Sequence, residues 1–142
     1  MHSAAQCNTE ECRRIRVLVV DEHQAVRHAI TALVSTLDDM ELAGEASSAK
    51  EALCLGTCAT PPDVALLGTT VSGNSGAEAC RALLCRWPSV RVIGMSTFQE
   101  EQHVQAVLDA GAVSYLLKNV SADQLAGAIR LAYAWHEPSG LA

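Results

Sequence analysis

The chain has 142 residues, of which 49% are hydrophobic and 18% are charged, a composition typical of one globular domain that can bury a core. Its net charge of -6 and its dispersed basic residues argue against direct nucleic-acid binding, which favours a basic face. No apolar run approaches the length of a membrane span, and residues 1–11 lack the apolar core of a signal peptide, so we expect a cytoplasmic protein without a membrane segment.

Six cysteines raise the question of a disulfide framework or a metal site. None of them belongs to a CxxC pair, which zinc sites usually contain. Cysteines at helical spacing commonly fill contacts between helices and a sheet in a reducing cytosol. We therefore predict thiols of the core or the surface, and no metal, at Cys7, Cys12, Cys54, Cys58, Cys80 and Cys85.

The first elements are a strand, a helix and a second strand. Residues 1–14 are polar and lack a helical or strand period, so we expect a mobile leader there. Residues 15–20, IRVLVV, are apolar on both faces, which is typical of an interior parallel strand. The apolar residues of 24–37 recur at three- and four-residue steps and predict an amphipathic helix. A short strand is expected at 41–46.

The next helix and strand are marked by capping and punctuation residues. Ser47 or Ser48 can cap a helix that runs toward Pro61, and Glu51 can complete a capping box. Residues 63–67 form a short apolar run between a proline pair and a Gly, Thr and Ser cluster, which predicts a buried strand.

Two further repeats of helix and strand follow. We expect a helix at 77–87, ended by Pro88, and a strand at 90–95. A helix at 99–110 precedes a strand at 113–117.

The chain's last predicted helix is 121–135, with Ser121 as its N-cap, while Gly111 caps the C-terminus of the helix before it.

Five repeats of strand and helix with short connections predict a parallel sheet with helices on both faces. We expect a doubly wound α/β fold with the strand order 2-1-3-4-5. In such sheets, function gathers beyond the carboxyl ends of the strands at the switch point between the first and third strands. Asp21, Glu22 and Gly68 should meet there.

Four motifs in this order resemble a known family: RVLVVDEH, PDVALLG, VIGMSTF and GAVSYLLK. They are similar to the receiver domain of bacterial two-component response regulators, over about residues 15–135. The likeness is strongest to receivers of the NarL/FixJ-like class, which precede a LuxR-type helix-turn-helix.

The resemblance implies a phosphorylation site at the strand ends. Asp21 and Glu22 match the acidic pair that holds a magnesium ion in the family. Gly68 stands where the family has the aspartate that accepts the phosphoryl group. Glycine offers no oxygen nucleophile, so phosphorylation at this position is excluded, and Mg²⁺ binding should be weak or absent because one carboxylate is lost.

Three more residues match the family's pattern. Ser96 matches the hydroxyl and Lys118 the lysine that bind phosphoryl oxygens, and Tyr115 matches the switch aromatic. Tyr115 can equally be a packed aromatic at the edge of the sheet. Three hydroxyls close to Gly68 could accept a phosphoryl group in its place: Thr69, Thr70 and Ser72. No kinase motif supports them.

The acidic pair has two interpretations. Asp21 and Glu22 could form a metal site with His23, but with Gly68 uncharged we expect the ammonium of Lys118 to turn to Asp21 and to form a structural ion pair. His23 is then a solvated residue at the start of a helix.

These residues predict a phosphorylation-independent receiver that is not an enzyme and that regulates transcription through protein contact. DNA binding would come only from a C-terminal helix-turn-helix outside this chain, with 136–142 as the start of a linker or tail. An alternative is a small-molecule sensor, in which a ligand occupies the emptied pocket around Asp21, Gly68, Ser96 and Lys118.

The expected output surface is the last helix. Its inward stripe leaves Leu131 and Trp135 on a flank that the sheet cannot cover. Apolar and aromatic side chains in such a position are typical of an interface, so we predict a homodimer or a heterodimer with a related regulator.

Overall fold

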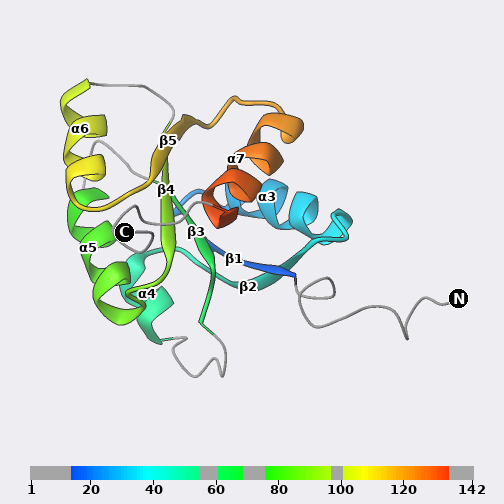
Figure 1. Cartoon of the computed structure of the whole chain (residues 1–142), viewed down its shortest axis with the longest axis horizontal. Helices are drawn as coiled ribbons and strands as arrows, with labels where there is room; N and C mark the ends of the chain where they lie inside the picture. The colour runs from blue at the N-terminus through cyan, green and yellow to red at the C-terminus, as the bar shows by residue number, and fades with distance from the viewer. Residues whose placement is uncertain (1–13, 55–60, 69–75, 97–100, 135–142) are drawn as a thin grey trace, which may run out of the picture.

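The computed structural model of the chain describes residues 14–54, 61–68, 76–96 and 101–134 (Figure 1). Most of the expected leader and all of the expected tail lie outside these ranges. The same holds for four single residues named above: Thr69, Thr70, Ser72 and Trp135.

Five parallel strands form one sheet in the order β2-β1-β3-β4-β5, which confirms the predicted doubly wound arrangement. The strands are β1 (Ile15–Val20), β2 (Met40–Ala46), β3 (Val64–Gly68), β4 (Arg91–Ser96) and β5 (Ser114–Leu117). β3 and β4 each extend one residue further than predicted, so Gly68 and Ser96 are the last residues of their strands.

Helices cover both faces of the sheet, as predicted. α3 (Gln24–Thr36) and α7 (Ala122–Ala134) lie on one face. The other face carries α4 (Ala49–Cys54), α5 (Gly76–Arg86) and α6 (Glu101–Asp109) (Figure 1). The chain is therefore a sandwich of three layers.

The alternation of side chains along each strand divides the core into two clusters. In β1, Val17 and Val19 pack under α3 and α7, whereas Leu18 and Val20 pack under the helices of the other face. β3 alternates in the same way, and all of these strand residues are almost completely buried. The sequences of these strands are apolar on both faces because helices cover both faces of the sheet.

The helix ends use the capping residues that the sequence predicts. The Ser121 hydroxyl accepts a hydrogen bond from the Gln124 N–H at 3.1 Å, and the Ser48 hydroxyl accepts one from the Glu51 N–H at 3.1 Å. The Ser47 N–H donates to the Glu51 carboxylate, and this bond lowers the pKa of Glu51. Gly111 follows α6 with φ at 121°, a region that favours glycine.

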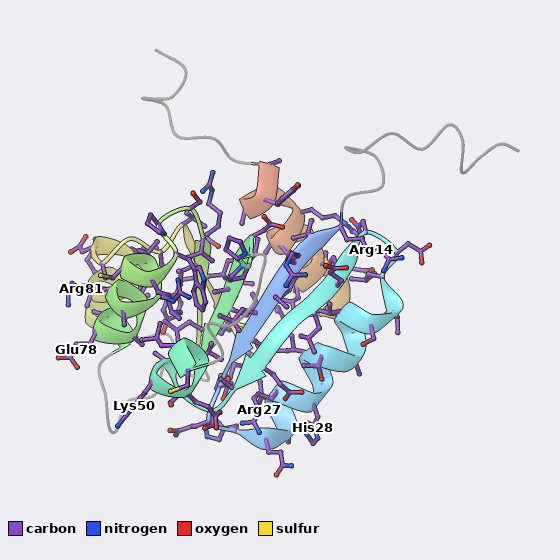
Figure 2. All side chains as sticks on the ribbon, turned by 90° about the horizontal axis from the view of Figure 1, so that it is seen from below. Arg14, Arg27, His28, Lys50, Glu78 and Arg81 are labelled. Atoms are coloured by element: carbon purple, nitrogen blue, oxygen red, sulfur yellow. The ribbon has the colours of Figure 1, made fainter. Side chains whose placement is uncertain are left out.

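Charged side chains are spread around the molecule. Figure 2 shows Arg14, Arg27, Lys50 and Arg81 at separate places on the fold. No helix in the described part of the chain is long and apolar enough to span a membrane.

Candidate functional site

The register of β1 and β3 brings Asp21 and Gly68 together. Val20 pairs with Leu67, so the next residues of the two chains, Asp21 and Gly68, lie side by side at the strand ends. Side chains alternate between the two faces along each strand, and both positions fall on the face that α3 and α7 cover. The predicted meeting of these two residues at the switch point is therefore confirmed.

The Asp21 carboxylate fills the space that a side chain at position 68 would take. A Cβ atom built on Gly68 would lie only 2.5 Å from Cγ of Asp21 and 3.2 Å from its Cβ. Non-bonded carbon atoms normally approach to about 3.5–4.0 Å. Asp21 can hold this position only because residue 68 is glycine.

Lys118 pairs with the same carboxylate. Its Nζ lies 2.8 Å from Oδ2 of Asp21, and the side chains are 9% and 2% exposed. The two atoms are close, but Oδ2 is a buried oxygen that accepts no hydrogen bond within the described structure. The contact is therefore an ion pair without an aligned hydrogen bond. The predicted ion pair is confirmed, and charge attraction at low exposure holds it.

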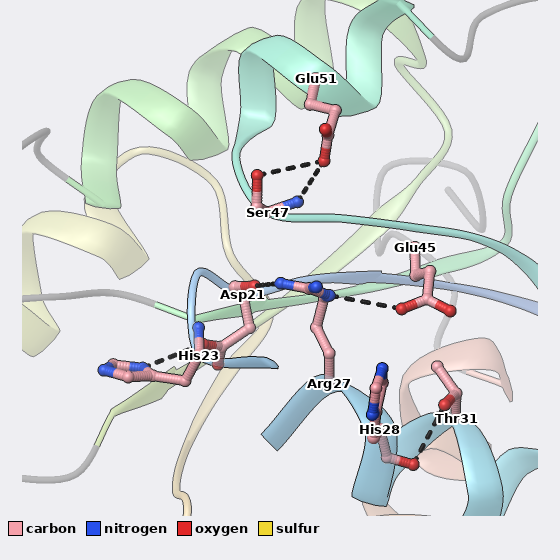
Figure 3. A network of polar contacts seen from close by, with 8 residues as sticks. All are labelled: Asp21, His23, Arg27, His28, Thr31, Glu45, Ser47 and Glu51. Carbon is pink, nitrogen blue, oxygen red and sulfur yellow. Dashed lines mark hydrogen bonds and ion pairs between the residues drawn. The ribbon is translucent and has the colours of Figure 1, made fainter. Parts of the chain in front are cut away.

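His23 lies against the carboxylate of Asp21 (Figure 3). Its backbone N–H donates to Oδ1 of Asp21 at 2.8 Å, and its ring Nδ1 lies 3.1 Å from the same oxygen. Nδ1 is also 3.2 Å from Nζ of Lys118. The ring is half exposed, so His23 covers the ion pair on its solvent side while it begins α3.

Arg27 fixes the backbone of Asp21 from α3 (Figure 3). One guanidinium nitrogen donates to the Asp21 carbonyl oxygen at 2.7 Å, and Nε donates to Glu45 of β2 at 3.3 Å. The Asp21 N–H donates to the Ala46 carbonyl at 3.0 Å. Asp21 is therefore held through its backbone as well as its carboxylate.

The other matched residues are placed differently. Ser96 ends β4 and is buried at 4% exposure, and its carbonyl accepts a hydrogen bond from the Lys118 N–H at 2.8 Å. Glu22 is exposed and does not join the ion pair. The structure therefore brings Asp21, Gly68 and Lys118 into contact, with Ser96 one strand away and Glu22 turned to solvent.

A cavity of about 340 Å³ borders Gly68 on the side of α4 and α5. Its floor includes Val20, Leu67 and Ala79, and its rim includes Glu22 and Lys50. Of the four residues expected around an emptied pocket, only Gly68 lines this cavity. This cavity therefore lies on the other side of the sheet from Asp21 and Lys118.

The last helix leaves an apolar flank uncovered, as predicted. Leu131 is 73% exposed, while Leu125, Ile129 and Ala132 are buried against the sheet. Leu131 also stands at a cavity of about 600 Å³ that runs between α7 and β5, with Leu116 in its wall. Trp135 lies beyond the described residues.

The contacts of His23 and Arg27 with Asp21 were not predicted from the sequence. A histidine two residues after an aspartate at a strand end is compatible with a backbone bond to the carboxylate. Arg27 gives no such signal, because its contact depends on how α3 packs on the sheet. Within the described ranges, no three His, Cys, Asp or Glu side chains gather as metal ligands.

Comparison with known proteins gives a consistent family assignment. A family model described as the response regulator receiver domain matches residues 17–130. Response regulator GacA of Pseudomonas protegens is 37% identical over 120 residues, which cover 84% of this chain and 56% of that protein. VraR of Staphylococcus aureus is 37% identical over 116 residues, covering 82% of this chain and 55% of VraR. The chain thus spans little more than half of these relatives.

Solved structures agree. The signal receiver domain of NarL from Mycobacterium tuberculosis matches with a TM-score of 0.75 at 30% identity, covering 87% of this chain and 99% of that domain. A LuxR-family response regulator from Aurantimonas matches with a TM-score of 0.75 at 27% identity, covering 85% of this chain and 86% of the other.

Proposed function

The chain belongs to the response regulator receiver family, in its NarL-like class, and we propose that it is a receiver that signals without being phosphorylated at the end of β3. Receivers accept a phosphoryl group on a carboxylate, and the matching residue here is Gly68. The proposal is of a binding module and not of an enzyme, working in the cytoplasm.

The observation that carries the proposal is the position of Asp21. Its carboxylate occupies the place of the missing side chain and is paired with Lys118 at 2.8 Å. The lysine that would bind a phosphoryl group already has an anionic partner within the protein. Asp21 is itself a poor acceptor, because its side chain is only 2% exposed and its Oδ2 is buried against the Lys118 ammonium.

The same arrangement argues against a magnesium ion. Mg²⁺ needs nearly octahedral oxygen ligation at about 2.0–2.1 Å. Here one oxygen of Asp21 faces the Lys118 ammonium and the other accepts the His23 N–H, while Glu22 is exposed. These residues do not fit the ion, so no step in the proposed function depends on it.

Output would come from a surface that is present in the resting state. Without a chemical signal to shift two states, only a conformation already populated, or a partner that prefers one state, can transmit information. α3 and α7 lie on the same face of the sheet, and α3 exposes small side chains at Ala25, Ala29 and Ala32. Together with Leu131 of α7, they support a homodimer or a heterodimer with a related regulator.

The relatives suggest the setting of this output. GacA and VraR are response regulators about twice as long as the matched region. We propose that the protein regulates transcription through a DNA-binding helix-turn-helix that is not part of the described domain.

Acetyl phosphate with Mg²⁺ tests the proposal directly. We expect no change in intact mass and no shift in the amide NMR spectrum of the wild-type protein, with a receiver that keeps its aspartate as a positive control. Beryllofluoride with Mg²⁺ should likewise leave the spectrum unchanged. A stoichiometric phosphoryl adduct anywhere at the strand ends would contradict a phosphorylation-independent function.

The cavity beside Gly68 favours a second candidate, a small-molecule sensor. Its apolar floor and charged rim could hold a small amphipathic ligand. Ligand-observed NMR with a mixture of metabolites would test this, with Ala79→Phe as the variant that fills the cavity. Binding to the wild type that is absent from Ala79→Phe would support a sensor, and no binding to the wild type would argue against it.

A further inference from the structure

The ring of Tyr115 lies across Gly94 on the neighbouring strand. The two residues are direct partners in the register of β4 and β5. A Cβ atom built on Gly94 would lie 2.7 Å from Cδ2 and 2.8 Å from Cε2 of the ring, which is too close for any side chain. Glycine inside a strand weakens it and often marks such a close approach. Gly94 is therefore the residue that makes room for the ring.

The same space is bounded by α6. The Cβ built on Gly94 would also lie 3.2 Å from Cγ1 of Val107, a completely buried residue of α6. Tyr115 packs against the apolar cluster that contains Val107, Val92 and Ala112. The ring thus fills the gap between β4 and α6, and α6 rests on it.

This contact lies on the opposite face of the sheet from the ion pair. Val92, two residues before Gly94, belongs to the cluster under α5 and α6, whereas Asp21 and Gly68 face α3 and α7. The ring position is fixed by packing within the layer of α6.

We propose that Gly94 is a positioning residue that holds Tyr115 beneath α6 and thereby fixes the surface made by α6 and β5 in one state. The inference rests on the proposed function, because a receiver without a phosphorylation signal needs a surface that is already set. Any side chain at position 94 would push the ring out of the gap and release α6.

The variant Gly94→Ala tests this, with Gly127→Ala as the matched control, since a Cβ on Gly127 of α7 meets nothing within 4 Å. We expect Gly94→Ala to lose the NMR contacts between the Tyr115 ring and the Val107 methyl groups. Amide exchange along residues 104–109 should become about tenfold faster, as local opening of a helix that has lost a packing partner. Gly127→Ala should change neither.

A second pair of variants covers the case in which Gly94→Ala folds poorly. In a Tyr115→Ala background the ring is gone and only the 3.2 Å approach to Val107 remains, so Gly94→Ala should lower the urea midpoint much less than in the wild-type background. In the wild-type background the same change should lower the midpoint. Equal losses in both backgrounds would show that the ring and position 94 do not compete, and would overturn the inference.

The outcome is separable from that of the proposed function. If acetyl phosphate modifies the wild-type protein, the proposed function fails, but the ring contacts of the unmodified protein still decide the role of Gly94. If Gly94→Ala keeps its Tyr115 to Val107 contacts, the role of Gly94 is wrong even when no phosphoryl group is accepted.

Discussion

The carboxylate of Asp21 lies where the first side-chain carbon of residue 68 would be, so Asp21 and Gly68 depend on each other. Glycine at 68 lets the carboxylate lie against the last residue of β3. The carboxylate in turn supplies the partner of Lys118, which the missing side chain cannot.

The first prediction concerns Gly68→Ala. The added Cβ would overlap the Asp21 carboxylate and push it away from Lys118. We expect a loss of about 1–3 kcal/mol in the free energy of unfolding, because two buried charged groups lose their partners. Urea unfolding measures it, and Gly127→Ala is the control that should lose nothing. An unchanged Gly68→Ala protein would mean that Asp21 can rearrange without cost.

The second prediction concerns Lys118→Ala. The Asp21 carboxylate is 2% exposed, so removal of the ammonium leaves a buried charge unpaired. We expect a loss on the order of 1–3 kcal/mol in the free energy of unfolding. Lys50→Ala, at an exposed position, should change it little.

A double-mutant cycle strengthens this test. If the ion pair is responsible, Asp21→Ala should remove most of the cost of Lys118→Ala. Additive losses in the double variant would place the effect of Lys118 elsewhere.

The third prediction concerns the flank of α7. Leu131→Glu combined with Trp135→Ala should shift a wild-type dimer to monomer in sedimentation velocity at micromolar concentrations. Removal of one central anchor of an interface can cost about 2 kcal/mol or more. Leu42→Glu is the control, because Leu42 is also exposed but lies on β2 at the other edge of the sheet. A wild-type protein that is monomeric throughout would refute the homodimer.

The fourth prediction concerns stability in acid. Arg130 of α7 binds the Asp39 carboxylate through two nitrogens, at 2.7 Å and 3.2 Å. This hydrogen bonding holds the pKa of Asp39 below its usual range. The unfolded chain therefore takes up the proton first. The stabilisation is complete above the usual pKa of an aspartate and is lost as the pH falls through the lower pKa of the folded state.

Urea midpoints of the wild type and Asp39→Asn would test this between neutral pH and about pH 3. The difference between the two proteins should shrink on acidification. It should be small throughout, because both side chains are about half exposed. A difference that stays constant with pH would mean that Asp39 acts through something other than its charge.

The sequence was sufficient for the fold because each element carries its own signal. The β1 run is apolar on both faces, and Ser48 and Ser121 cap the helices that they were expected to cap. The order of the strands follows from the repeat of strand and helix. The predicted ends of β3 and β4 were one residue too early, because pairing with a neighbouring strand decides where a strand ends.

The site was predicted in its membership and its charges, but not in its geometry. The pairing of Lys118 with Asp21 follows from the absence of a charge at 68. The entry of the carboxylate into the space of residue 68 depends on strand register, and so does the stacking of Tyr115 on Gly94. The register of two strands pairs residues that are distant in the sequence, so it cannot be predicted from a local pattern.

The shared position of Asp21 and residue 68 also bears on the history of the protein. An aspartate at position 68 would bring back the phosphate acceptor of the family. A chain that makes this change, however, meets a site whose space and whose lysine are already taken. The substitution would have to be accompanied by movement of Asp21 before it could be selected. An aspartate at position 68 would therefore not by itself restore the phosphorylation site.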